Sequence, residues 1–240
     1  MISFFRKIRK SLLNQNKIKR YTPYALGEIS LVVIGIVIAV NINNWNEQQK
    51  VKTQELKTLA ELKSALQADL VDIKFNINWH ESARNACEVL LVVIDKKIPY
   101  NDSLANHFGS MTRFSQFLPD LSTYEAIKVS GLGLISNDSL RLEMAHYYEN
   151  EIKFALGTEA INRSLPPMNM ELYRKHFYVN AILTYATPKN YNTLVRDDEF
   201  ISYLYETKGF RQNEVQLFQD LAMTCNRLIE FIDEELNNNQ

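Results

Sequence analysis

A run of ten apolar residues near the start of the chain, Leu31 to Val40, most constrains what this sequence can fold into. The wider segment 24–45 contains 22 residues, and its only charged side chain is that of Glu28. This length suffices for a helix to cross a bilayer, and its eleven Leu, Ile and Val residues outweigh the cost of one acid. Aromatic side chains mark both ends, as they do at membrane interfaces: Tyr21, Tyr24 and Trp45. The sequence therefore predicts a transmembrane helix over residues 24–45.

The tail before this segment, residues 1–23, is strongly basic. It carries seven of the 27 Lys and Arg residues and none of the 28 acids, so the remainder of the chain is acidic. The positive-inside rule then predicts a cytoplasmic N-terminus and an exported C-terminal part. No small-x-small cleavage site follows the apolar run, which favours an uncleaved signal anchor. Apolar residues recur among the cations near helical spacing, which indicates a helix on anionic lipid, with nucleic acid as the weaker alternative.

Six residues in and beside the predicted span are candidates for a role beyond anchoring: Glu28, Gly35, Ala39, Asn43, Asn44 and Trp45. Gly35 and Ala39 form a small-xxx-small pair, which lets two membrane helices approach closely and suggests self-association. Glu28 is expected roughly 6 Å inside the hydrocarbon edge. There it either binds a proton, an ion or a basic partner residue, or is simply an acid favoured by the helix N-terminus, which is the preferred interpretation.

Residues 46–240 contain two long apolar stripes at helical spacing. The first has steps of three and four residues: Leu56, Leu59, Leu62, Leu66, Leu70, Ile73 and Ile77. No Gly or Pro separates Gly35 from Pro99, so the membrane helix is predicted to continue into this stripe. After Phe75 and Trp79 the stripe changes phase, which predicts a bend or a new packing partner. The second stripe lies near the C-terminus: Leu217, Leu221, Cys225, Leu228, Ile232 and Leu236.

The two stripes have the length to pack antiparallel, so the predicted fold class is all-α, with one N-terminal transmembrane helix continuing into an antiparallel helical bundle. Shorter elements are expected between them. The sequence predicts a capping box at Ser122–Glu125, a helix end at Gly131, a helix from Ser136 or Asn137 to Gly157, a helix over 168–185 and a last helix from Asp197. No Gly-, Ser- or Pro-rich linker divides residues 46–240, which we therefore treat as one domain.

No motif in the sequence identifies a reaction. The glycine patterns of nucleophile elbows, P-loops and dinucleotide sites are absent, so no cofactor is predicted. The four histidines show no metal-ligand spacing, which argues against a metal site: His80, His107, His146 and His176. Cys87 and Cys225 are each interpreted as a buried thiol, although in an exported domain they could instead form a disulfide.

The stretches YALGEISLVVIGIVIAVNINNWNE at 24–47 and STYEAIKVSGLGLISNDSL at 122–140 resemble an uncharacterised family of bacterial single-pass membrane-anchored helical proteins, known only as a domain of unknown function. FFRKIRKSLL at 4–13 adds to a similarity that covers nearly the whole chain. The resemblance implies one membrane helix near the N-terminus and a helical remainder. It implies no activity, cofactor or catalytic residue.

These patterns favour a non-enzymatic protein of the bacterial inner membrane, whose exported helical domain binds a protein partner or itself. Membrane lipid is the expected partner of the tail and the span, and no nucleic acid is expected. An alternative is a bundle that senses a small ligand and signals through a membrane partner, because a tail of 23 residues cannot hold a signalling domain. The third hypothesis is an exported hydrolase, which a nucleophile and a base side by side in a pocket would support.

Overall fold

The computed structural model describes residues 18–164 and 170–239. The lipid-binding helix predicted in the basic tail falls on residues that lie outside these ranges. The chain divides into two compact units, Met1–Gln54 and Glu55–Gln240. A single helix, α2 (Ile18–Asp95), runs across this division without a break, as expected from the lack of Gly and Pro between Gly35 and Pro99. Pro23 lies inside α2, in its second turn, where its missing N–H removes one backbone hydrogen bond of the helix.

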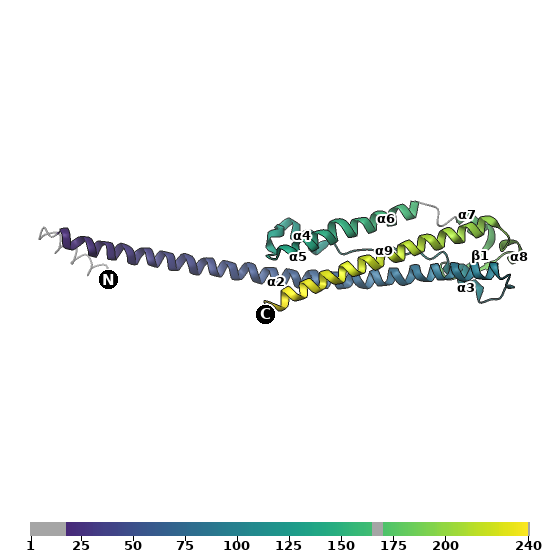
Figure 1. The fold of residues 1–240 in the computed structure, drawn as a ribbon, viewed down its shortest axis with the longest axis horizontal. Coiled ribbons are helices and arrows are strands. Elements are labelled where there is room, and N and C mark those ends of the chain that lie inside the picture. The colour runs from purple at the N-terminus through teal and green to yellow at the C-terminus, as the bar shows by residue number, and fades with distance from the viewer. Residues whose placement is uncertain (1–17, 165–169, 240) are drawn as a thin grey trace. The chain divides into compact units, whose positions relative to one another are not determined.

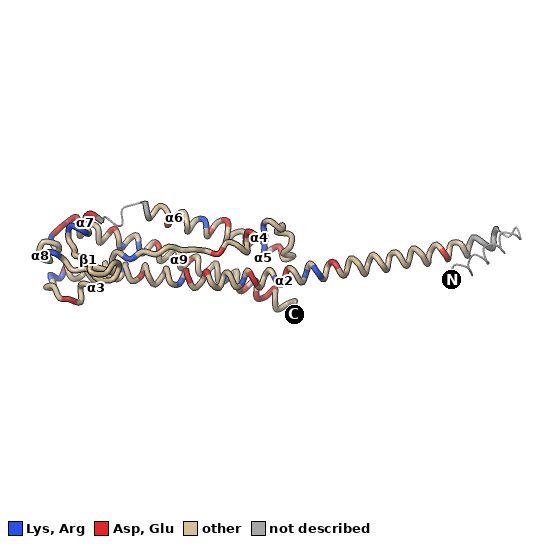
Figure 2. The backbone as a smooth tube through the Cα atoms, turned by 180° about the vertical axis from the view of Figure 1, so that it is seen from behind, with Lys and Arg blue, Asp and Glu red and all other residues tan. Residues whose placement is uncertain are grey.

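Within Met1–Gln54, α2 exposes apolar side chains on all its faces. No charged residue occurs between Glu28 and Glu47, and this stretch is tan in Figure 2. The large side chains from Leu31 to Val40 are between 50% and 70% exposed. The most apolar window of this helix has a mean hydropathy of 2.3, and none of it is buried. By length and composition, the helix could therefore cross a membrane.

Within Glu55–Gln240, the long C-terminal helix α9 (Asp198–Asn237) lies beside α2 and runs antiparallel to it (Figure 1). Lys63 Nζ contacts Asp233 Oδ1 at 2.5 Å near one end of the pair. Toward the other end, Lys208 Nζ contacts Glu88 Oε1 at 3.5 Å. The two predicted stripes meet between these helices, where most of their residues are buried; Ile77, Leu217 and Leu236 are partly buried. The all-α, antiparallel prediction is thus confirmed.

Shorter elements complete this unit. They are α3 (Leu104–Ser110), α4 (Ser122–Ser130), the 3-10 turn η1 (Leu132–Leu134), α5 (Asp138–His146), the π-helical turn η2 (Tyr147–Glu151), α6 (Ile152–Ser164), α7 (Met170–His176), strands β1 (Phe177–Ala181) and β2 (Tyr185–Pro188), and α8 (Tyr191–Leu194). In Figure 1, α4 to α6 lie along the α2–α9 pair, whereas α3, α7, α8 and the strands gather near the end of α2.

Two local predictions about helix ends need correction. Helix α4 starts where expected, but the capping box is wrong, because the Ser122 hydroxyl donates to Asp120 Oδ1 at 2.6 Å instead of capping the helix. Gly131 ends α4 with a φ of 95°, as predicted. Asn137 caps α5, as predicted, by accepting a hydrogen bond from the Leu140 amide. The helical run from α5 continues through η2 and α6 to Ser164, so the end predicted at Gly157 is wrong. Gly157 faces open space and adopts a helical backbone.

The helix predicted over residues 168–185 is wrong for its second half. After α7, strands β1 and β2 form an antiparallel hairpin that turns at Leu183, a non-glycine residue with a φ of 63°. The sequence there is rich in Tyr, Phe, Val and Thr, which favour strands, and this signal could have found the hairpin. Strand β2 crosses α3 very closely. The crossing needs a glycine at position 109, because a Cβ there would lie 2.1 Å from the Tyr185 amide nitrogen.

The buried side chains form two separate apolar cores. The first core joins the stripes of α2 and α9 to tyrosines of α4 and η2, including Tyr124, Tyr147 and Tyr148. The second core joins the end of α2 to Phe108 of α3, Phe177 of β1 and Phe200 of α9. The change of stripe phase after Trp79 coincides with the passage from one core to the other. The expected change of packing partner is therefore confirmed, and α2 remains an unbroken helix there.

The two cysteines belong to different cores and are both free. Cys225 Sγ contacts the Leu66 carbonyl at 3.4 Å, whereas Cys87 lies 21 residues further along α2, a separation of roughly 31 Å. The disulfide alternative is therefore wrong. Burial raises the pKa of Cys87 to about 12 and that of Cys225 to about 11, so both remain unreactive thiols.

Candidate functional site

The six membrane-helix candidates all lie on α2. Ala39, Asn43 and Asn44 are exposed, Trp45 is 62% exposed and Glu28 is half-buried. A Cβ on Gly35 would meet nothing within 4 Å and Ala39 is exposed, so among the described residues of this unit no element packs on the pair. Their proposed roles in binding and self-association stay predictions.

An exposed apolar surface on the second unit is the strongest candidate for a binding site. We call it the lateral surface and define it by five exposed residues around a half-buried tryptophan: Val71, Phe75, Trp79, Phe114, Leu118 and Ile182. The exposed fractions are 70% for Val71 and 51% for Phe75 on α2, and 71% for Leu118 opposite them. Monomeric proteins seldom leave several large apolar side chains exposed together unless a partner covers them.

The segment 113–121 builds one side of this surface, and it lies along α2 without regular secondary structure. Carboxylates accept its backbone N–H groups: Leu118 N donates to Asp72 Oδ2 at 3.0 Å, and Asp120 N donates to Asp69 Oδ1 at 2.8 Å. These bonds replace the missing secondary-structure hydrogen bonds. They fix the segment against α2, so that Leu118 sits beside the turn that carries Val71.

Arg113 organises the other part of the lateral surface. Its guanidinium carbon lies 4.7 Å from the centre of the Trp79 ring, and Trp79 in turn stacks on Phe75 at 5.4 Å. Arg113 Nε also donates to the Leu183 carbonyl at 2.8 Å, which holds the hairpin turn and its exposed Ile182 against α2. A tryptophan paired with an arginine among exposed apolar residues has the composition of an interface hot spot.

A buried polar layer separates the two cores. His80 Nδ1 lies 3.0 Å from Glu214 Oε2, and Arg211 Nη1 donates to the same oxygen at 2.5 Å. All three residues are at most 5% exposed. Burial opposes ionisation of Glu214, but His80 and Arg211 outweigh it and lower its pKa to about 2. The layer therefore holds an ionised carboxylate of α9 against His80 of α2.

Ser115 approaches the same layer, with its Oγ 3.3 Å from His80 Nε2. Ser115, His80 and Glu214 are thus ordered as nucleophile, base and acid. His80 is however 1% exposed and stacks on Phe218 at 5.7 Å, which leaves it no open face for a substrate. We therefore interpret the contact between Ser115 and His80 as a structural one, which holds the segment 113–121 against α2.

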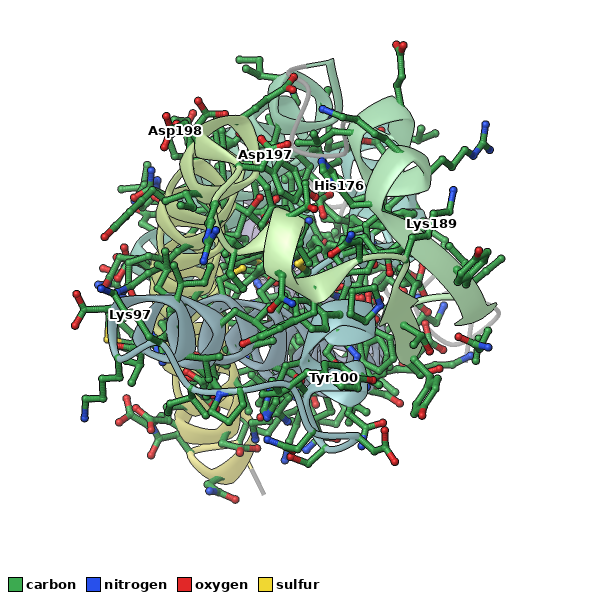
Figure 3. The ribbon with its side chains drawn as sticks, turned by 90° about the vertical axis from the view of Figure 1, so that its right-hand side faces the viewer. Lys97, Tyr100, His176, Lys189, Asp197 and Asp198 are labelled. Atoms are coloured by element: carbon green, nitrogen blue, oxygen red, sulfur yellow. The ribbon has the colours of Figure 1, made fainter. Side chains whose placement is uncertain are left out.

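A second polar contact, between His176 and Asp197, joins the end of α7 to the start of α9; both residues are labelled in Figure 3. His176 Nε2 lies 3.0 Å from Asp197 Oδ2, while Asp197 Oδ1 caps α9 by accepting from the Phe200 amide at 3.1 Å. Burial lowers the pKa of His176 despite the nearby carboxylate. This pair joins the hairpin end of the unit to α9 and has the geometry of a structural contact.

None of the four histidines shares a metal-ligand cluster in the part of the chain that the structure describes, where no three His, Cys, Asp or Glu side chains could hold an ion together. Sequence reasoning noted Phe75 and Trp79 only as the point where the stripe changes phase, and it missed Phe114, Leu118 and Ile182. The spacing of Val71, Phe75 and Trp79, four residues apart on a face outside the buried stripe, was the signal available for the lateral surface.

Comparison with known proteins identifies a family without a described activity. Residues 28–195 match the model of a family described as "Family of unknown function (DUF6090)". No curated protein and no solved structure matches the chain. The matched range runs from Glu28 on α2 past the end of α8, and it includes every residue of the lateral surface.

Proposed function

Because the chain belongs to this family of unknown function, DUF6090, we propose its role from its own residues: it is a non-enzymatic, single-pass membrane protein whose helical domain binds a protein partner or a second copy of itself through the lateral surface. The single observation that carries the proposal is that surface. Its apolar side chains are held in place by Arg113 and by the carboxylates of α2, although no element of the described chain covers them.

The proposed location is the inner membrane of a bacterium, with the basic tail in the cytoplasm and the helical domain outside it. The exposed apolar stretch of α2 supports the anchor, since an uncovered Leu31–Val40 would be costly in water. The excess of Lys and Arg before the span supports the orientation. A reporter enzyme that is active only outside the cytoplasm, fused to the C-terminus, should be active. Release of the chain from vesicles by alkaline carbonate would contradict the anchor.

A photo-crosslinking amino acid at Phe75 tests the binding surface in intact cells. We expect a crosslinked product, either a dimer or a complex with another membrane or envelope protein, after irradiation. The same amino acid at Tyr205 of α9, which is 63% exposed and lies outside the lateral surface, should give little product. Equal yields at the two positions would count against the proposal.

Substitutions sharpen this test. Leu118→Ser and Leu142→Ser remove side chains of nearly equal exposure, 71% and 72%, but only the first lies on the lateral surface. We expect Leu118→Ser to lower the crosslinking yield from Phe75 at least fivefold, and Leu142→Ser to leave it unchanged. Both variants should keep the thermal stability of the parent, because neither side chain is buried.

A second candidate function, ester or amide hydrolysis, rests on one observation, the order of Ser115, His80 and Glu214. Hydrolysis ranks below protein binding as a proposed function, because His80 is buried and has no open face for a substrate. A fluorophosphonate probe, which labels activated serines, tests it directly in detergent extracts. Labelling that disappears in Ser115→Ala would support hydrolysis, whereas absence of labelling under conditions that label a control serine hydrolase would exclude it.

A further inference from the structure

A groove lies between α2 and α3, beside the lateral surface; most of its lining residues have polar side chains, but its accessible surface is more apolar than polar. Its volume is about 390 Å³, within the range of small-molecule sites. Residues of both helices line it: Asn78, Glu81, Ser82, Asn85, Ala86 and Val89 from α2, and Asn106, His107 and Ser110 from α3. Ala86 and Val89 give it an apolar patch, and the remaining side chains can all form hydrogen bonds.

Two arginines outside the groove orient two of its side chains. Arg84 donates to Asn85 Oδ1 at 3.1 Å through Nη2, so the amide NH₂ of Asn85 is the part left to donate to a ligand. Arg113 Nη1 donates to Ser82 Oγ, so the Ser82 hydroxyl is likewise set to donate. Donors that are held in place before binding lose little entropy when a ligand arrives. The groove therefore presents fixed donors next to an acceptor, the Glu81 carboxylate.

The charge of the lining selects the class of ligand. The lining itself contains one carboxylate and no Lys or Arg. The two flanking arginines, Arg84 and Arg113, already donate to Asn85, to Ser82 and to acceptors outside the groove, so the lining has no unengaged cation for a phosphate or a carboxylate ligand. Burial lowers the pKa of His107, which favours the neutral form of its imidazole. Three carboxamides and two hydroxyls provide donors and acceptors together, the combination that neighbouring hydroxyl groups of a ligand can satisfy. The apolar patch suits the C–H faces of such a ligand.

We propose that the groove between α2 and α3 binds a neutral, polyhydroxylated ligand, a saccharide. In this proposal Glu81 and Asn78 accept and donate from α2, Asn106 and Ser110 do so from α3, and Ala86 and Val89 supply the apolar contact. This site goes beyond the proposed protein-binding role, because its residues and the chemistry of its ligand differ from those of the lateral surface. It gives the helix that carries the apolar segment a second, independent contact.

Saturation-transfer NMR on the full chain tests the site. The chain is kept in a zwitterionic detergent, since detergents with sugar headgroups would compete. The probes are a panel of neutral mono-, di- and trisaccharides, with putrescine and citrate as charged alternatives. We expect transfer to at least one neutral saccharide, with a dissociation constant of about 1 mM or lower. Transfer to putrescine alone, or to no saccharide in the panel, would overturn the proposal.

A pair of variants separates the groove from the rest of the surface. Asn85→Leu should weaken saccharide binding at least tenfold, because it replaces an oriented amide by an apolar group. Asn226→Leu makes the same replacement at an exposed position of α9 and should change nothing. Unchanged melting temperatures show that both variants fold. Equal binding by the two variants would place the saccharide elsewhere and refute the groove. Crosslinking from Phe75 should be unaffected by Asn85→Leu, so failure of this site and failure of the protein-binding surface are distinguishable.

Discussion

The two cores of the helical unit are built by different means. In the first core, half of the buried residues come from two long regular helices, whose apolar residues repeat every three or four positions. In the second core, α3, β1 and α9 each contribute one phenylalanine, and the rings of Phe108 and Phe177 lie 5.0 Å apart. A stripe on a long helix is visible in the sequence, whereas a cluster of rings from three separate elements is not.

This difference teaches where each core is vulnerable. The first core depends on side-chain volume along the α2–α9 pair, and the loss of one leucine leaves a cavity. The second core depends on close backbone approach, seen where β2 crosses Gly109. The polar layer between them depends on the pairing of charges.

The largest effect is expected in the polar layer. Arg211→Met should lower the free energy of unfolding by about 3–5 kcal/mol, because it leaves Glu214 as a buried carboxylate without its arginine. Arg227→Met is the matched control: Arg227 is exposed and its partner Glu143 is partly exposed, so the expected loss is less than about 1 kcal/mol. Urea unfolding followed by circular dichroism measures both. Similar losses would show that the layer does not bind the two cores together.

The first core should respond strongly to lost volume. Leu66→Ala removes a fully buried side chain, and we expect a loss of about 2–5 kcal/mol in the free energy of unfolding. Val71→Ala is the control on the same helix, where the side chain is 70% exposed, and should change stability by about 0.5 kcal/mol or less. If the two variants unfolded at the same urea concentration, the assignment of the buried face of α2 would be wrong.

The second core should respond to added volume instead. Gly109→Ala forces a methyl group against the backbone of Thr184 and Tyr185, with an expected loss of about 1–3 kcal/mol. Gly157→Ala places the same methyl in open space within α6 and should stabilise the protein by about 0.5–1 kcal/mol. Opposite signs of the two melting-temperature shifts confirm the close crossing of α3 and β2. A stabilising Gly109→Ala would contradict it.

The smallest expected effect concerns pH. Burial raises the pKa of Asp69 to about 6, from an ordinary value of 3.8. Its contribution to stability is therefore complete below about pH 4 and is lost as the pH rises through about 6. Asp69→Asn keeps an oxygen for the Asp120 amide and should remove about 1 kcal/mol of this pH dependence between pH 5 and 7.5. Parallel stability curves for the parent and the variant would contradict a titrating Asp69.

The sequence predicts both long helices and the buried faces of their stripes from apolar residues at helical spacing. It also predicts the end of α4 from Gly131. The predicted helix over 168–185 includes strand β1 and the hairpin turn, because Phe177, Tyr178 and Val179 give no clear helical or alternating period. Tyr147 and Tyr148 are both buried because the π-helical turn η2 widens the helix there, and no residue pattern announces such a turn. The lateral surface and the groove each combine α2 with other segments of the chain. The spacing of Val71, Phe75 and Trp79 is therefore a signal for only one part of the lateral surface.

The amino-acid sequence alone determined that an apolar segment separates a basic tail from a remainder with a net negative charge. It also determined that one helix continues from this segment into the remainder, and that two helices with apolar stripes pair. These properties depend on short-range periodicity, on charge counts and on the absence of helix breakers. Tertiary structure alone decided that Arg113 meets Trp79, that Glu214 meets His80, and that the two cysteines stay apart. Such contacts depend on which residues distant along the chain become neighbours in space, and only the packing of the whole unit fixes that.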